Sequence, residues 1–152
     1  MKRLKNIASL LIIILLSLTS CDKVDKNGDL DGMWQCQNYS GIIENGKPYL
    51  SVQLDLLNIR YADYNIYARF EHNGNTLRIY NAYSALNDID TPFSEAKEHG
   101  DVNQSHAYHS IWFLYSLLGT NELGEATLNI KSLTSKQMIL EVGEKELIFR
   151  KY

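Results

Sequence analysis

The sequence predicts an all-β protein: a small antiparallel β-barrel, closed or nearly closed, with one short helix. Three observations lead to this fold class. From Gly32 onward, apolar residues mostly recur at every second position, the period of a strand with one buried face. Turn signals separate these runs at short intervals, and ten tyrosines add to the β-forming residues. A chain of 152 residues has room for one domain with one core. An open β-sandwich is the alternative that the same pattern allows.

The charge balance argues against a nucleic-acid-binding role. The chain carries 18 acidic and 15 basic side chains, and three of the basic ones lie in the first twenty residues, which contain no acid. Without that segment, 12 basic side chains stand against 18 acidic ones. A protein that binds nucleic acid needs a basic face to neutralise phosphates. We therefore expect no nucleic-acid partner.

Residues 1–20 have the features of a cleaved secretory signal peptide. A basic start precedes an apolar stretch, Ile7 to Leu18, that is too short to cross a hydrocarbon core about 30 Å thick. The stretch ends in Leu18-Thr19-Ser20-Cys21, which resembles the lipobox of bacterial lipoproteins. The resemblance implies cleavage before Cys21 and attachment of acyl chains such as palmitate to this residue. Two or three acyl chains hold a soluble domain on a membrane. An uncleaved helix with a chance cysteine is the alternative.

The predicted organisation has two further parts. Residues 21–31 comprise the lipidated cysteine and a short polar tether, and residues 32–152 form the barrel domain. If Cys21 is acylated, Cys36 has no cysteine left for an internal disulfide. The sequence neighbours of Cys36 offer no basic or histidine side chain that would activate a thiol. We expect Cys36 to be a small buried apolar residue in a strand.

The strands are predicted from alternation and from turns. The first extends from Met33 to Tyr39, and a longer one from Tyr49 to Tyr61 changes its apolar parity midway, which predicts a β-bulge or a bend. Asn73-Gly74 predicts a two-residue hairpin turn between the apolar runs on either side. Three further runs near the end of the chain cover residues 128–130, 138–142 and 147–149.

One segment has the period of a helix rather than of a strand. The helix is expected to begin at Ser105 or Ser110 and to end at Gly119. A buried strand is the alternative, because the segment is apolar almost all round. The preceding residues, 87–104, are polar and are predicted to form a long loop. The helical stripe consists of Tyr108, Ile111, Trp112, Tyr115 and Leu118.

The start of the domain carries a family resemblance. The run Leu30-Asp31-Gly32-Met33-Trp34 resembles the Gly-x-Trp signature that opens the first strand of lipocalins. Residues 54–83 and 133–152 are similar to lipocalin-like lipoproteins of Bacteroidota, a group with no established activity. The resemblance implies that Trp34 closes one end of the barrel and that Arg150 packs across its ring, a cation–π contact worth about 1 kcal/mol.

Two sets of residues are candidates for ligand binding. Arg150 and Tyr152 resemble the Arg-x-Tyr pair with which fatty-acid-binding proteins grip a carboxylate, and two residues of this spacing share one face of a strand. Trp112 and Tyr115 on the predicted helix are expected to form, together with Phe113, a lid over an apolar ligand. Ordinary core packing is the alternative for these aromatics.

Catalytic and metal-binding signals are weak. We find no nucleophile elbow, no phosphate-binding glycine loop and no carboxylate pair that could be placed across a cleft. His99, His106 and His109 could supply three nitrogens to a metal on a helix, but no accompanying motif supports such a site. The expectation is a protein that is not an enzyme, with no metal and no cofactor.

The leading interpretation is a membrane-anchored lipoprotein of the cell envelope whose barrel binds a small apolar or amphipathic molecule. We expect it at the outer membrane, with exposure at the cell surface as one arrangement. The alternative is a non-catalytic interaction or assembly module with a filled barrel core. For that alternative, exposed tyrosines around a bend are the first surface to consider, namely Tyr61, Tyr64 and Tyr67.

Overall fold

The computed structural model describes residues 26–41 and 46–152. This part of the chain contains nine strands, one α-helix and two short 3-10 helices. The strands are β1 (Gly32–Cys36), β2 (Tyr49–Gln53), β3 (Leu56–Tyr61), β4 (Tyr64–Asn73), β5 (Thr76–Leu86), β6 (Ile89–Pro92), β7 (Ala126–Leu133), β8 (Gln137–Val142) and β9 (Lys145–Lys151). The helices are η1 (Gly28–Leu30), η2 (Phe93–Glu95) and α2 (Val102–Leu118).

Eight of these strands form a closed antiparallel barrel. The pairing order β4-β3-β2-β1-β9-β8-β7-β5 returns to its start because β4 also pairs with β5. Strand β6 pairs only with the second half of β5, from Tyr83 to Leu86, and lies outside the closed ring. The register between β4 and β5 shifts between Tyr67 and Arg69, which indicates a β-bulge just before the part of β5 that also pairs with β6. The predicted all-β barrel is confirmed, and the open sandwich is not observed.

The barrel interior is filled by the protein's own apolar side chains. Buried and exposed residues alternate along the strands, so that one face of each points inward. An eight-stranded barrel has an interior just wide enough for side chains to fill it. The lining side chains form one contiguous core with the buried face of α2. Trp34 and Phe149 are its largest fully buried members, with Leu50, Leu57, Ile59, Ile66, Leu77 and Ile79.

One end of the barrel is closed by η1 and by the residues of the Gly-x-Trp signature. The Trp34 indole N–H donates to the Leu30 carbonyl oxygen at 2.8 Å, and both side chains are fully buried. Lys151 lies over the indole, with its Nζ 4.9 Å from the ring centroid, and donates to the Asp29 carbonyl at 2.8 Å. Gly32 makes room for it, because a Cβ at Gly32 would lie 2.8 Å from Lys151 Cε.

Two predictions at this end were wrong. The cation over Trp34 is Lys151 and not Arg150, because successive residues of β9 point to opposite faces and Arg150 points to solvent. The tether was predicted to extend to residue 31, yet Leu30 is fully buried and Asp31 accepts two hydrogen bonds from Asn27. The folded domain therefore begins before the first strand.

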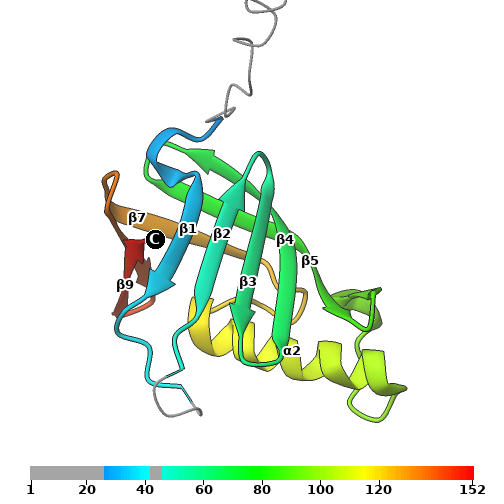
Figure 1. The fold of residues 1–152 in the computed structure, drawn as a ribbon. Coiled ribbons are helices and arrows are strands. Elements are labelled where there is room, and N and C mark those ends of the chain that lie inside the picture. Colours follow the sequence, from blue (N-terminus) through cyan, green and yellow to red (C-terminus); the bar gives the residue numbers. More distant parts are fainter. Residues whose placement is uncertain (1–25, 42–45) are drawn as a thin grey trace, which may run out of the picture.

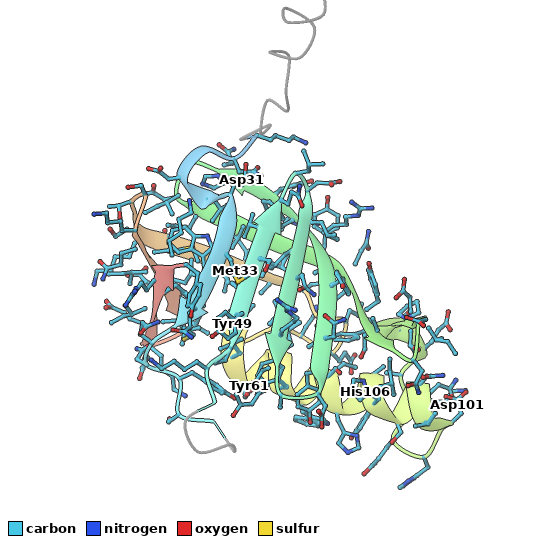
Figure 2. All side chains as sticks on the ribbon, viewed as in Figure 1. Asp31, Met33, Tyr49, Tyr61, Asp101 and His106 are labelled. Atoms are coloured by element: carbon cyan, nitrogen blue, oxygen red, sulfur yellow. The ribbon has the colours of Figure 1, made fainter. Side chains whose placement is uncertain are left out.

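The opposite end of the barrel is closed by α2 (Figure 1). Phe113 stacks between two tyrosines at the β3–β4 turn, with ring centroids 5.0 Å from Tyr61 and 5.2 Å from Tyr64. Tyr61 lies beside the helix and Asp31 lies at the other end of the barrel (Figure 2). Tyr61 is only 5% exposed, so the predicted surface of Tyr61, Tyr64 and Tyr67 was wrong.

Several predicted element boundaries differ from the structure. Residues 49–61 are a hairpin rather than one bent strand, because Leu54 adopts a φ of 57° and Asp55 follows it in a two-residue turn. The predicted hairpin near Asn73 is confirmed, but Gly74 and Asn75 are its central residues. The predicted loop 87–104 contains β6, η2 and the first turn of α2.

The predicted helix is confirmed, and it begins earlier than expected. Asp101 caps it by accepting hydrogen bonds from the backbone N–H groups of Asn103 and Gln104, and the Gln104 side chain completes a capping box. Gly119 ends the helix in the left-handed conformation with a φ of 66°. In the described residues no helix is long and apolar enough to cross a membrane. The predicted signal peptide and Cys21 lie outside the described residues.

Candidate ligand groove along helix α2

The helix α2 has two apolar faces. Its inner face buries Ala107, Phe113, Leu114, Leu117 and Leu118 against the barrel. Its outer face carries Tyr108, Trp112 and Tyr115, three aromatic residues of the predicted helical stripe. Trp112 and Tyr115 are each 57% exposed. An all-round apolar helix normally lies in a protein interior, so these exposed aromatics need a separate explanation.

The exposed rings form a continuous aromatic surface. Trp112 contacts Tyr108 and Tyr115 edge to face, with centroid separations of 6.2 Å in both pairs and interplanar angles of 75° and 82°. Edge-to-face pairs of this kind are favourable. The three rings therefore form one wall of neighbouring side chains that support one another.

The opposite wall comes from two segments distant in sequence, η2 and the loop after α2. Together with α2 they enclose an open groove of about 710 Å³. This volume lies in the range of small-molecule sites. The groove is lined by Phe93, Ser94, Ala96, Tyr108, Ile111, Trp112, Tyr115, Thr120, Asn121, Glu122 and Leu123.

The loop after α2 is held in place by its own hydrogen bonds. The Asn121 side-chain oxygen accepts from the backbone N–H groups of Leu123 and Glu125 at 3.0 and 2.9 Å. Gly124 has a φ of 72°, and a Cβ there would lie 2.5 Å from the Ala82 side chain and 2.8 Å from Phe93. Only glycine permits this close approach of the loop to η2. The second wall of the groove is therefore fixed as well.

The groove contains few polar groups. Thr120 is 1% exposed, and its hydroxyl oxygen is buried without a hydrogen-bond partner in the described residues. Glu122 is the one charged residue of the lining. A mostly apolar groove with a few convergent polar groups is typical of small-molecule sites.

A second hollow, of about 400 Å³, adjoins the groove. Ser94 and Leu123 line both. Asp90 and Glu125 are the charged residues of this second hollow, and Tyr83 also lines it. Burial raises the pKa of the Tyr83 phenol, and the negative charge of Asp90 adds to this effect.

The structure brings together only half of the predicted ligand-binding residues. Trp112 and Tyr115 line the groove, whereas Arg150 and Tyr152 do not. Arg150 is exposed, and Tyr152 is 80% exposed with its ring 6.0 Å from that of Tyr49. The prediction missed the residues of the opposite wall, because they lie in a region that was predicted to be loop and have no periodic pattern of their own.

The three candidate metal-binding histidines have different surroundings. His99 is exposed, and His109 Nδ1 lies 2.7 Å from the Ser105 carbonyl oxygen. His106 Nδ1 lies 2.9 Å from the Ser84 hydroxyl, which in turn lies 3.1 Å from that of Ser110. Across residues 26–41 and 46–152, no group of three His, Cys, Asp or Glu side chains is placed to hold a metal ion. The Ser84–His106–Ser110 network instead connects α2 to β5.

Comparison with known proteins identifies the family to which this chain belongs. The family model of a lipocalin-like domain matches residues 15–152. The chain belongs to this lipocalin-like domain family. The predicted resemblance and the lipocalin-like barrel are thereby confirmed. A search of curated proteins finds no match.

Two solved structures are similar to this lipocalin-like chain. One is a lipocalin-like protein from Bacteroides uniformis, with 18% identity, a TM-score of 0.48, and coverage of 82% of this chain and 100% of that one. The other is an uncharacterized protein from Bacteroides eggerthii, with 16% identity, a TM-score of 0.48, and coverage of 80% and 98%. In the lipocalin-like barrel described here, the α2 groove lies outside the closed ring of strands.

Proposed function

We propose that the protein is a lipid-anchored lipocalin-like protein of the cell envelope that binds a small apolar or amphipathic molecule in the α2 groove. One observation carries the proposal: two large aromatic side chains, Trp112 and Tyr115, remain more than half exposed on a preformed groove of ligand size. Large exposed apolar patches on soluble domains mark interaction or ligand sites.

The barrel interior is the less favoured location for a ligand. Its inward side chains pack together as one core, and both ends are covered, by η1 at one end and by α2 at the other. A ligand in the interior would have to displace core side chains, which are packed at the density of an organic crystal. The outer face of α2 requires no such displacement.

The experiment uses the fragment 22–152, which contains every described core residue and both closures of the barrel. N-phenyl-1-naphthylamine, a neutral apolar dye, is the probe, and native mass spectrometry checks for co-purified molecules. We expect the double variant Trp112→Ala/Tyr115→Ala to weaken dye binding about tenfold or more, because two aromatic contacts are lost.

The control is Tyr152→Ala, which removes a still more exposed aromatic side chain that lies outside the groove. We expect this variant to bind the dye like the parent protein. Equal binding by the parent and the double variant, or no binding by the parent, would contradict the proposed groove.

The membrane anchor is a separate part of the proposal. What supports it is the resemblance of Leu18-Thr19-Ser20-Cys21 to a lipobox. In cells grown with labelled palmitate, we expect the full chain to carry label and to sediment with membranes, and Cys21→Ala to abolish both. Cys36→Ala is the control that should keep them. Unchanged labelling of Cys21→Ala would overturn the anchor.

The second candidate function is a non-catalytic interaction or assembly module. The filled barrel core favours it, because such a module needs no interior cavity. The two candidates differ in what occupies the groove. A bare protein mass, unchanged after incubation with mixed lipids, would favour the module. That no reaction is catalysed stays a prediction.

A further inference from the structure

The α2 groove carries one carboxylate, and the hollow beside it carries two more. Of its lining residues only Glu122 is charged, and the adjoining hollow adds Asp90 and Glu125. Neither hollow is lined by a lysine, an arginine or a histidine. Within the described residues, none of the three carboxylates belongs to a salt bridge. In the described part of the chain no cation is paired with them, and Asn121 donates a hydrogen bond to the Glu125 carboxylate at 3.3 Å.

The aromatic wall adds to this preference. The faces of Trp and Tyr rings are electron-rich and attract ammonium groups, most strongly in the case of Trp. Tyr108, Trp112 and Tyr115 line the same groove as Glu122. An anionic headgroup would be repelled by the carboxylates and would gain nothing from the electron-rich ring faces. A cationic ligand would be attracted by both.

We propose that the groove selects a small cationic amphiphile, whose apolar body lies between Trp112 and Leu123 and whose ammonium group faces Glu122. This inference rests on the proposed function, since it specifies the ligand class of the same site. The sequence predicted that Arg150 and Tyr152 bind an anionic carboxylate, whereas the groove is proposed here to bind a cation.

The test compares three probes with the same chain length: octyltrimethylammonium, octanol and octyl sulfate. Binding to the 22–152 fragment is followed by tryptophan fluorescence. Of the two tryptophans, Trp34 is fully buried and Trp112 is exposed, so Trp112→Phe should remove the response and identify its source. We expect the ammonium probe to bind about fivefold to tenfold more tightly than the sulfate, with octanol between them. The difference should shrink as salt is added.

Two variants assign the preference to Glu122. Glu122→Gln should reduce the preference for ammonium over sulfate, and Glu122→Lys should reverse it. Both changes affect an exposed loop side chain, so folding is not at risk. The control is Glu144→Gln, an equally exposed carboxylate at the β8–β9 turn, which should change nothing.

The outcomes separate this inference from the proposed function. If none of the probes binds, the proposed function fails together with the inference. If octanol and octyl sulfate bind as tightly as the ammonium probe, only the charge preference is overturned. A preference for ammonium that persists in Glu122→Lys would overturn the role of Glu122.

Discussion

The two ends of the barrel are closed by different means, and the difference points to the functional end. At the η1 end, Trp34 is fully buried, its N–H is hydrogen bonded and Lys151 lies across its ring. At the α2 end, Phe113 is buried between Tyr61 and Tyr64. Beside the first closure the terminal Tyr152 is exposed, in contact with Tyr49 only by its edge, whereas α2 carries a second face of three neighbouring aromatic residues that line a groove.

Closure of the barrel explains only one face of α2. A helix that served only as a plug would be expected to carry a polar outer face, because a half-exposed aromatic side chain adds less to folding than a buried one. The ring pairs of Trp112 stabilise the helix modestly, and we attribute the rest of the reason for this aromatic face to ligand binding. We expect substitutions on the two faces of α2 to have separable effects, on unfolding for the inner face and on ligand binding for the outer face.

The largest expected effect is at the inner face of α2. Phe113→Ala should lower the free energy of unfolding by about 3 kcal/mol or more, because it leaves a cavity between two stacked rings. Trp112→Ala, one residue earlier, should cost only about 1 kcal/mol, because its side chain is more than half exposed and loses two edge-to-face ring contacts. Urea unfolding followed by circular dichroism measures both. Equal destabilisation by the two variants would show that the outer face belongs to the folding core.

The next effect concerns the η1 end and is smaller. Lys151→Met should cost about 1 kcal/mol, since it removes the cation over Trp34 and keeps most of the apolar stem. Arg150→Met is the matched control and should have almost no effect, because Arg150 points to solvent. The same urea titration compares them. A larger loss for Arg150→Met would restore the contact first predicted from the family resemblance.

The position of Lys151 over Trp34 also shows how far the fold can be predicted from the sequence. The barrel, the helix and the three C-terminal strands follow from local patterns of period and turn residues. The exchange of Arg150 for Lys151 also follows from a local pattern: Leu147 and Phe149 point inward, so Lys151 shares their face of β9 and Arg150 does not. The family resemblance indicates that a cation covers Trp34, and the alternation of the strand indicates which one.

The groove was predictable on one side only. Trp112 and Tyr115 lie on a helical stripe that the sequence displays, although the stripe faces solvent and not the core. The opposite wall depends on Phe93 and Leu123, which are 30 residues apart in sequence and meet because Gly124 packs against η2. Contacts of this kind arise from tertiary packing, and no local pattern encodes them.

The smallest expected effect tests whether the interior between the two closures is dry. Cys36 is fully buried, and burial raises the pKa of its thiol above the ordinary value of about 8.5. As pH rises above that value, the unfolded chain loses the thiol proton while the folded chain retains it. The unfolded state then binds fewer protons, so the free energy of unfolding falls.

The 22–152 fragment, which lacks Cys21, allows this effect to be isolated. Between pH 7 and pH 9.5, the free energy of unfolding should fall by roughly 1 kcal/mol more for the parent than for Cys36→Ala, because other titrating groups contribute equally to both. Urea unfolding at the two pH values measures the difference. Identical pH dependence in the two proteins would mean that the Cys36 thiol ionises as readily in the folded chain as in the unfolded one. Water would then reach the interior through one of the closures, and a ligand could enter the barrel by the same path.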